Sequence, residues 1–250
     1  MPLAACIWAL TCPQEDALKQ TADAGFTHID IRPSWLQTSD LQQQTKDLGL
    51  SISCIAASAE KPEGVSLASD NPQPARDHIC RAFEHAASLG ATTAYLVPEG
   101  DDPNRFAESL PILAESAQNT GLKLGIEHFP GTILPTVPFT LEYLQKIDHP
   151  NLYLLFDIGH AQMANENPAD MIALTGDRLL YVHLDDNDGE NDLHLSLCDG
   201  VLTEDVLQAT FTALQAANYT GNISLELKSD IPDPLDALKR SRNIVLQNQP

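Results

Sequence analysis

Basic residues are scarce in this chain of 250 residues. Lysine and arginine together number 14, against 35 aspartates and glutamates, so the formal net charge is −21. A surface this negative repels the phosphates of nucleic acids and the headgroups of anionic lipids. We therefore expect neither a nucleic-acid partner nor a membrane partner. The charge says little about a small neutral substrate.

Several signatures that would assign a class are also missing. No apolar run approaches the roughly 20 residues of a membrane span, and the first eight residues carry no basic leader. The five cysteines are scattered and contain no Cys-x-x-Cys pair, which favours reduced thiols over a disulfide framework. Neither a glycine-rich phosphate loop nor a nucleophile elbow is present. We expect a soluble, cytoplasmic protein.

The chain does contain a repeated alternation of short apolar segments and amphipathic segments, with glycine often following the latter. Expected strands are residues 6–9, 27–32, 51–57, 93–97, 123–129, 152–160, a strand ending in 181–187, and 222–228. Expected helices are 13–24, 39–48, 74–89, 103–119, 139–147, one between the sixth and seventh strands, 204–217 and 233–247. Eight strand-helix units in this length predict an α/β fold, a single (β/α)8 TIM barrel over residues 1–250.

Such a barrel carries its chemistry at the carboxyl ends of its strands. Side chains alternate along a strand, so the inward-facing polar residues near each strand end can be counted. This count predicts that four residues meet at the rim: Glu127, Asp157, His183 and Glu226.

Two glutamates, an aspartate and a histidine form a hard, oxygen-rich set that suits Mg²⁺ or Mn²⁺ and tolerates Co²⁺ or Zn²⁺. Burying the four groups together without a cation would cost many kcal/mol through desolvation and like-charge repulsion. We therefore predict one divalent cation held by these residues. The alternative is that individual acids are satisfied by Lys228, Arg32 or backbone groups.

The motifs around these residues resemble a known family. They are Gly-Ile-Glu-His at 125–128, Phe-Asp-Ile-Gly-His at 156–160, Val-His-Leu-Asp-Asp-Asn-Asp-Gly at 182–189 and Ser-Leu-Glu-Leu-Lys at 224–228. They are similar to those of the xylose isomerase-like barrel superfamily, which holds sugar and sugar-phosphate isomerases and epimerases, inosose dehydratase-like enzymes and endonuclease IV-type nucleases.

The resemblance implies roles for individual residues. It makes Glu127, Asp157, His183 and Glu226 the metal ligands, and it makes the two glutamates the acid/base pair of an epimerase. His160 would bind a substrate hydroxyl, or else serve only as a helix-capping or core residue.

The chain also departs from particular branches of that superfamily. The ketose 3-epimerase pattern has an arginine six positions after the seventh-strand histidine, where this chain has Gly189. Asp192-Leu193-His194 resembles the Asp-x-His that the endonuclease branch uses for an additional zinc. That branch also needs histidines at the ends of the third and fourth strands, and residues 53–58 and 95–100 contain none.

A few further residues are candidates for substrate binding. Asp192 and His194 could bind a second cation or a substrate hydroxyl, or could belong to a solvated acidic loop. Lys228 could contact a phosphate or carboxylate of the substrate, or balance the glutamates. Arg32 could bind an anionic group, and Trp8 could stack on a sugar ring.

The leading hypothesis is a divalent-metal-dependent isomerase or epimerase of a sugar, keto-sugar or related polyol, working by proton transfer through an enediolate. The main alternative is a metal-dependent dehydratase or lyase acting on a keto-polyol. A non-catalytic sugar-binding barrel and an endonuclease IV-like hydrolase are less favoured. The expected partner is a small sugar or polyol, and a homo-oligomer is compatible with the resemblance.

Overall fold

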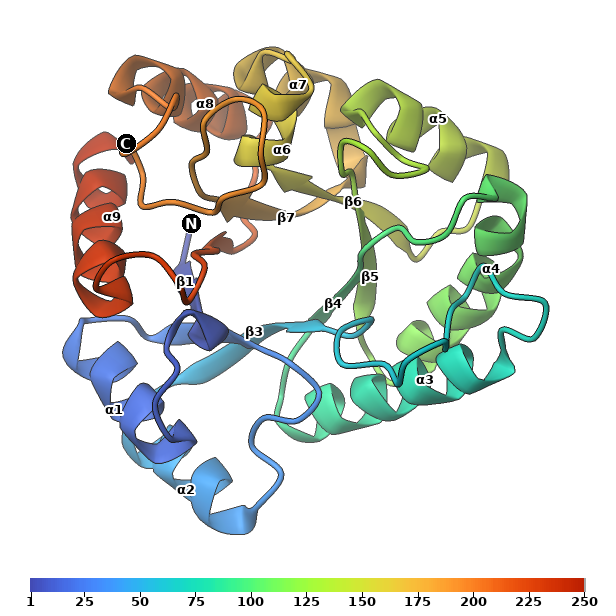
Figure 1. Cartoon of the computed structure of the whole chain (residues 1–250), viewed down its shortest axis with the longest axis horizontal. Coiled ribbons are helices and arrows are strands. Elements are labelled where there is room, and N and C mark those ends of the chain that lie inside the picture. The colour runs from blue at the N-terminus through green and yellow to red at the C-terminus, as the bar shows by residue number, and fades with distance from the viewer. Residues whose placement is uncertain (250) are drawn as a thin grey trace.

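A computed structural model describes residues 1–249, in which eight parallel strands close into a barrel in chain order (Figure 1). Strand β1 pairs with β2 on one side and with β8 on the other, which closes the ring. The strands are β1 (Leu3–Cys6), β2 (His28–Ile31), β3 (Ser51–Ala56), β4 (Thr93–Leu96), β5 (Lys123–Glu127), β6 (Leu152–Asp157), β7 (Leu179–Leu184) and β8 (Ile223–Leu225). The predicted (β/α)8 fold is confirmed.

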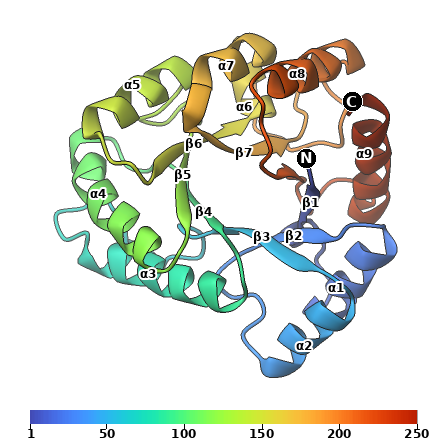
Figure 2. The same cartoon turned by 180° about the vertical axis from the view of Figure 1, so that it is seen from behind.

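Helices surround this barrel on all sides (Figures 1 and 2). The α-helices are α1 (Gln14–Asp23), α2 (Ser39–Asp47), α3 (Gln73–Ser88), α4 (Pro103–Asn119), α5 (Val137–Ile147), α6 (Ile158–Met163), α7 (Pro168–Thr175), α8 (Glu204–Ala216) and α9 (Pro234–Asn248). Two short 3-10 helices lie at Ile7–Ala9 and Gly176–Arg178.

Local sequence accounts for most of the helix boundaries. Side-chain oxygens of Thr38, Asp102, Thr136 and Thr203 accept backbone hydrogen bonds at the starts of α2, α4, α5 and α8, which satisfies amides that a helix start leaves unpaired. Glycines end several of the helices; Gly90 follows α3 with a φ of +84°, a left-handed conformation that glycine adopts without strain.

The core lies between the outer face of the barrel and the inner faces of the helices. Helix α3 contributes a buried stripe at helical spacing: Ile79, Ala82, Phe83 and Ala86. Burying a side chain such as Phe83 stabilises the fold by about 1.5–3 kcal/mol. Helix α9 lies beside α1 at the closing edge, where the Arg242 guanidinium donates to the Gly25 carbonyl at 3.1 Å (Figure 2).

Several predicted boundaries were wrong; the fifth, seventh and eighth strands, for instance, end at Glu127, Leu184 and Leu225 rather than at residues 129, 187 and 228. The first strand was predicted over residues 6–9, but β1 ends at Cys6 and the rest forms a 3-10 turn. That apolar run contains no glycine or proline to mark a strand end, and pairing with β2 and β8 decides which part of it is strand. The sixth strand ends at Asp157, so residues 158–160 begin helix α6. Two α-helices, not one, link β6 to β7.

The described part of the chain has two further general properties. All five cysteines are free, as the scattered spacing predicted. Between residues 1 and 249, no helix has both the length and the apolar character that crossing a bilayer requires.

Candidate metal centre

The structure brings the four predicted ligand residues together at the carboxyl ends of adjacent strands. Glu127 and Asp157 end β5 and β6, and His183 lies near the end of β7. Glu226 follows β8 directly, and its N–H still bonds to the Leu184 carbonyl. One ligand atom from each of the four lies within 4.8 Å of the others.

His183 lies at the centre of this group. Its Nδ1 is 2.5 Å from Glu226 Oε2, 3.7 Å from Glu127 Oε1 and 4.0 Å from Asp157 Oδ2. The side chains of His183 and Asp157 are fully buried, whereas that of Glu226 is 13% exposed. The open side of the group is therefore the Glu226 side.

The charges in this group shift one another's titration. Burial alone would lower the pKa of His183, but the carboxylates of Glu226 and Glu127 outweigh burial and raise that pKa well above its ordinary value. Burial likewise would raise the pKa of Glu226, and the charge of His183 lowers it instead. In the absence of a cation, a proton on His183 thus supplies the positive charge that these carboxylates require.

The four residues fit a divalent cation. Asp157 Oδ1 accepts the His160 N–H at 2.8 Å and so caps helix α6, which fixes the orientation of the carboxylate. The second oxygen, Oδ2, is buried and has no hydrogen-bond partner among the described residues. A buried carboxylate oxygen without a partner is costly, and a cation among three carboxylates and an imidazole would satisfy it.

Asp30 faces His183 from inside the barrel, a contact that sequence analysis missed. It is fully buried, its Oδ2 lies 3.8 Å from His183 Nε2, and its Oδ1 accepts the Tyr181 hydroxyl at 2.7 Å. A metal-binding histidine commonly directs its other ring nitrogen at a carboxylate, which orients the ring. The alternation of residues 27–32 puts Asp30 on the inward face, one residue before the end of β2, but nothing in the sequence indicates that it faces His183 from across the barrel.

A second group of titratable residues adjoins the first. His160, Asp192 and His194 each offer a ligand atom within 4.8 Å of the others, as do Asp157, Asp185 and His194. His194 Nδ1 lies 2.6 Å from Asp185 Oδ2, and its Nε2 lies 2.9 Å from Asp192 Oδ1. Burial alone would lower the pKa of His194, but these two carboxylates raise it strongly.

His160 is packed inside this second group and is almost fully shielded from solvent. Its Nδ1 donates to the His128 carbonyl at 3.0 Å, and its Nε2 points toward Asp192 Oδ1 at 3.3 Å. Phe129 stacks on the ring with centroids 4.2 Å apart. The ring is nearly completely buried and its Nδ1 is already paired with the His128 carbonyl, so only Nε2, itself buried beside Asp192, is left for a substrate hydroxyl.

The loop between β7 and α8 holds Asp192 and His194 in place. In Figure 1 it is the orange segment that lies over α6 and β7, on one side of the barrel end. Asp186 fixes both of its ends, since its carboxylate accepts the N–H groups of Gly200 and Leu202 at 2.7 and 2.8 Å. Asp185 Oδ1 accepts the Gly159 N–H at 3.1 Å, which ties the loop to helix α6.

A small cavity of about 160 Å³ opens beside Glu226. It brings together four of the six residues named as candidates for substrate binding, while His160 and Asp192 are not among its lining residues. Its lining consists of Trp8, Arg32, His194, Glu226, Leu227, Lys228 and Ser229. Lys228 pairs with Asp192 at 3.5 Å, so its direct partner is not one of the two glutamates.

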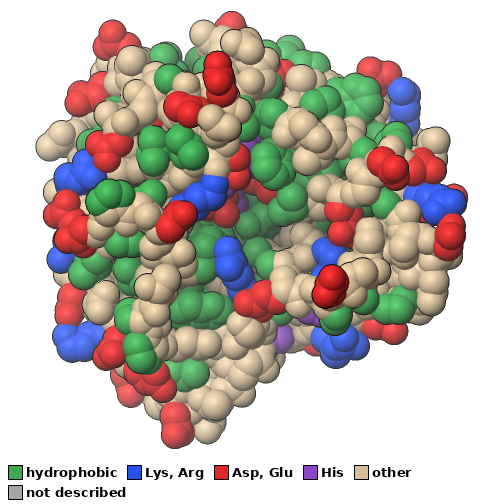
Figure 3. Space-filling model, viewed as in Figure 1, with side chains coloured by type: hydrophobic (Ala, Val, Ile, Leu, Met, Phe, Trp, Pro, Cys, Tyr) green, Lys and Arg blue, Asp and Glu red, His purple; other side chains and the backbone are tan. Residues whose placement is uncertain are grey.

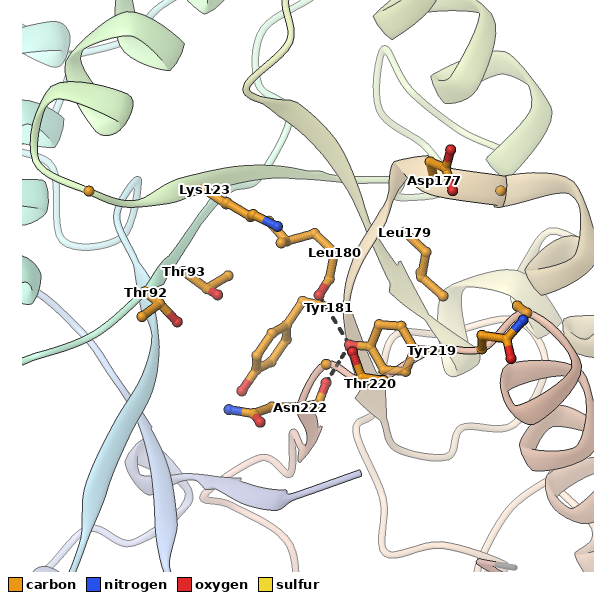
Figure 4. A pocket seen from close by; sticks show the side chains of 15 residues that line it. Thr92, Thr93, Lys123, Asp177, Leu179, Leu180, Tyr181, Tyr219, Thr220 and Asn222 are labelled. Atoms are coloured by element: carbon orange, nitrogen blue, oxygen red, sulfur yellow. Dashed lines mark hydrogen bonds between the residues drawn. The ribbon is translucent and has the colours of Figure 1, made fainter.

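A larger hollow of about 600 Å³ lies at the opposite end of the barrel (Figure 4). Thr93, Lys123 and Asn222, at or just before the starts of β4, β5 and β8, line it, and the Tyr219 hydroxyl donates there to the carbonyls of Leu180 and Asn222. Residues at the amino ends of barrel strands serve stability rather than catalysis. The candidate site is therefore the smaller cavity.

Known proteins resemble this chain in both sequence and structure. An uncharacterized protein of Methanocaldococcus jannaschii is 35% identical over 167 residues, which cover 62% of this chain and 55%, or about half, of that relative. The 2-oxo-tetronate isomerase of Pectobacterium atrosepticum is 27% identical, over 69% of this chain and 72% of the isomerase. The L-ribulose 3-epimerase of Mesorhizobium japonicum is 25% identical, over 91% of this chain and 81% of the epimerase.

A solved structure shares the whole fold. The D-allulose 3-epimerase from Methylomonas sp., in complex with D-allulose, matches with a TM-score of 0.84 at 17% identity, covering 99% of this chain and 97% of the epimerase. The family model described as xylose isomerase-like TIM barrel matches residues 18–247. Because that match spans nearly the entire barrel, the chain belongs to the xylose isomerase-like TIM barrel family.

Proposed function

We propose that this protein is a divalent-metal-dependent isomerase or epimerase of a keto-sugar or related polyol. The observation that carries the proposal is the convergence of Glu127, Asp157, His183 and Glu226 beside a cavity large enough for a small molecule. The names of two relatives, 2-oxo-tetronate isomerase and L-ribulose 3-epimerase, support the same chemistry.

The four converging residues would hold the cation. When bound there, a divalent cation supplies a Lewis acid that polarises a carbonyl and acidifies the neighbouring carbon-bound proton. Glu127 and Glu226 reach the group from different strands, so each can accept or return a proton at the reacting carbons. Return by the same glutamate to the adjacent carbon gives isomerisation, and return by the other to the opposite face gives epimerisation.

Glu226 is the better placed of the two to meet the substrate, because it lines the cavity and is partly exposed. Glu127 lies deeper, with Oε1 3.7 Å from both His160 Nδ1 and His183 Nδ1. His160 remains a predicted contact for a substrate hydroxyl, through its Nε2.

A dehydratase is the second candidate, and the position of His194 favours it. His194 lines the same cavity as Glu226 and lies between the carboxylates of Asp185 and Asp192. Such a pair of carboxylates holds a proton on the imidazole, and that proton could pass to a hydroxyl leaving as water.

Proton exchange with solvent tests the proposal. The protein loaded with Mn²⁺ is incubated with a panel of ketoses in deuterated water, and deuterium incorporation at carbon is followed by NMR. Glu226→Gln should slow exchange by about 10²–10⁴-fold, the usual contribution of a positioned acid/base group. Glu190→Gln removes the same charge from an exposed position on the loop after β7; it is the matched control and should leave the rate unchanged.

Other outcomes separate the alternatives. A product lighter by one water identifies the dehydratase. Sugar binding without exchange, equally strong in Glu226→Gln, would contradict the proposal and leave a non-catalytic binding barrel.

A further inference from the structure

Two basic side chains, Arg32 and Lys228, line the cavity beside Glu226. Their presence there is unexpected in a chain with a net charge of −21, in which acidic groups outnumber basic ones. Figure 3 shows basic side chains beside the central hollow on the face seen in Figure 1. The surroundings of each one show whether it serves the fold or faces the cavity.

No carboxylate of residues 1–249 lies within ion-pair distance of the Arg32 guanidinium, and the guanidinium donates no hydrogen bond to these described residues. The guanidinium does lie over the ring of Trp8, whose centroid is 4.9 Å from Cζ. Stacking on an aromatic face holds the planar guanidinium in one orientation while leaving its donors open.

Lys228 is only partly neutralised. Its Nζ lies 3.5 Å from Asp192 Oδ2, and 38% of its side chain is exposed. The backbone N–H of Lys228 donates to the His194 carbonyl at 3.1 Å, which fixes the start of the side chain beside the cavity. An ammonium group has three donors, so two remain for a ligand.

We propose that Trp8, Arg32 and Lys228 form a subsite for an anionic end group of the sugar, a carboxylate or a phosphate. The inference rests on the proposed function and names its substrate class, a sugar acid or a sugar phosphate. A guanidinium fork matches the paired oxygens of either group, and an ammonium adds a point charge. The cavity of about 160 Å³ joins this subsite to Glu226, so one small molecule can place its reacting carbons at Glu226 and its anionic end at Arg32.

Matched substrates test this subsite. Exchange of carbon-bound protons is measured for D-ribulose against D-ribulose 5-phosphate, and for D-tagatose against D-tagaturonate. One anionic sugar should exceed its neutral partner in kcat/KM by at least about tenfold, since a charge-assisted hydrogen bond contributes roughly that much or more. Preference for the phosphate or for the acid identifies which anion the subsite takes.

Variants show whether the two cations cause the preference. Arg32→Gln and Lys228→Gln should each reduce kcat/KM for the preferred anionic sugar by about ten- to a hundredfold and leave the neutral sugar within about twofold. Arg81→Gln and Lys239→Gln remove the same charges from exposed helix positions and should change neither. Circular dichroism and metal content confirm that each variant is folded.

Calorimetric binding of non-reacting compounds separates this inference from the proposed function. D-Arabinonate or D-arabitol 5-phosphate should bind the Mn²⁺-loaded protein more tightly than D-arabitol, and Arg32→Gln should remove the difference. That result without any proton exchange would uphold the subsite while the proposed function fails. Equal binding of all three compounds, with equal kcat/KM for neutral and anionic sugars, would overturn the subsite while the proposed function stands.

Discussion

Asp30 provides a sharp test of how the candidate metal centre is built. Replacing it with asparagine keeps the size of the side chain and an oxygen that can accept the Tyr181 hydroxyl, but it removes the negative charge behind His183. Burial raises the pKa of Asp30 to about 6, so the native carboxylate is mostly ionised at pH 7.5. We expect Asp30→Asn to weaken metal binding without unfolding the barrel.

The expected size of this effect follows from the geometry. Asp30 Oδ2 lies 3.8 Å from His183 Nε2, beyond a normal hydrogen bond, so the interaction acts through charge. At an effective dielectric constant of about 20, two unit charges at that distance interact by roughly 4 kcal/mol, an upper bound on the net effect. Loss of a carboxylate behind a ligating histidine typically costs about 10- to 100-fold in metal affinity, or roughly 1.4–2.7 kcal/mol.

Competition titration of Mn²⁺ or Co²⁺ against a chelating dye measures the affinity. Tyr181→Phe is the matched control, because it removes the hydrogen bond to Asp30 Oδ1 and keeps the charge; we expect a loss of a few-fold at most. A folded Asp30→Asn protein that binds the cation within about threefold of wild type would refute the supporting role.

Three further predictions concern the metal, the charges and the loop. Elemental mass spectrometry of the purified protein should find about one divalent cation per chain, with Asp157→Asn losing it; a protein that takes up none when supplied with Mn²⁺, Mg²⁺, Co²⁺ or Zn²⁺ would contradict the candidate metal centre. When a chelator has removed the metal, nearby carboxylates outweigh burial and raise the pKa of His160 to about 10. The carboxylates of Glu226 and Glu127 raise the pKa of His183 in the same way. A histidine whose pKa is higher in the folded than in the unfolded protein stabilises the fold. This contribution is complete below the unfolded-state pKa of about 6.5 and is lost as the pH rises through the folded-state pKa. The Tm with chelator should therefore fall from pH 6 to pH 9, and saturating Mn²⁺ should reduce that fall. If the Tm falls equally steeply with pH with and without Mn²⁺, the histidines that titrate are not part of the cation site. Gly159→Ala should destabilise the protein by about 1–3 kcal/mol in urea unfolding, because the added methyl group would clash with Asp185 Oδ1 and come within 2.9 Å of Asn187 Nδ2; unchanged stability would show that the loop yields freely.

Much of the fold was predictable because its signals are local. Residues 103–119 were predicted as a helix, and α4 has the same bounds, since Asp102, Pro103 and the glycine after the helix all mark its ends. Residues 6–9 were placed wrongly because an apolar run carries no information on which of its residues pair. Pairing of Ala4 with His28 and Ser224 settled that register, and it depends on segments far away in the sequence.

The convergence of Glu127, Asp157, His183 and Glu226 was predictable for a related reason. In a closed parallel barrel every strand ends at the same rim, so alternation along each strand suffices to place a side chain inside or outside. The same rule could have found Asp30, which shares the inward face of its strand. It was overlooked because an inward acid can be assigned to the site only when the residues that face it from across the barrel, here Tyr181 and His183, are known.

The second group could not be placed by any such rule. Asp192 and His194 follow β7 on a loop with no periodicity, and His194 adopts a left-handed φ of 42° that no residue pattern predicted. The loop is positioned by buried contacts that act across it, including the bridge between Asp186 and Leu195 and the carboxylate of Asp186 on Gly200 and Leu202. Gly189, which occupies the position of the epimerase arginine, also has a left-handed φ, of 87°, a conformation that disfavours any larger side chain. The anionic subsite proposed at Arg32 would supply its positive charge from the residue after β2 rather than from the β7 loop.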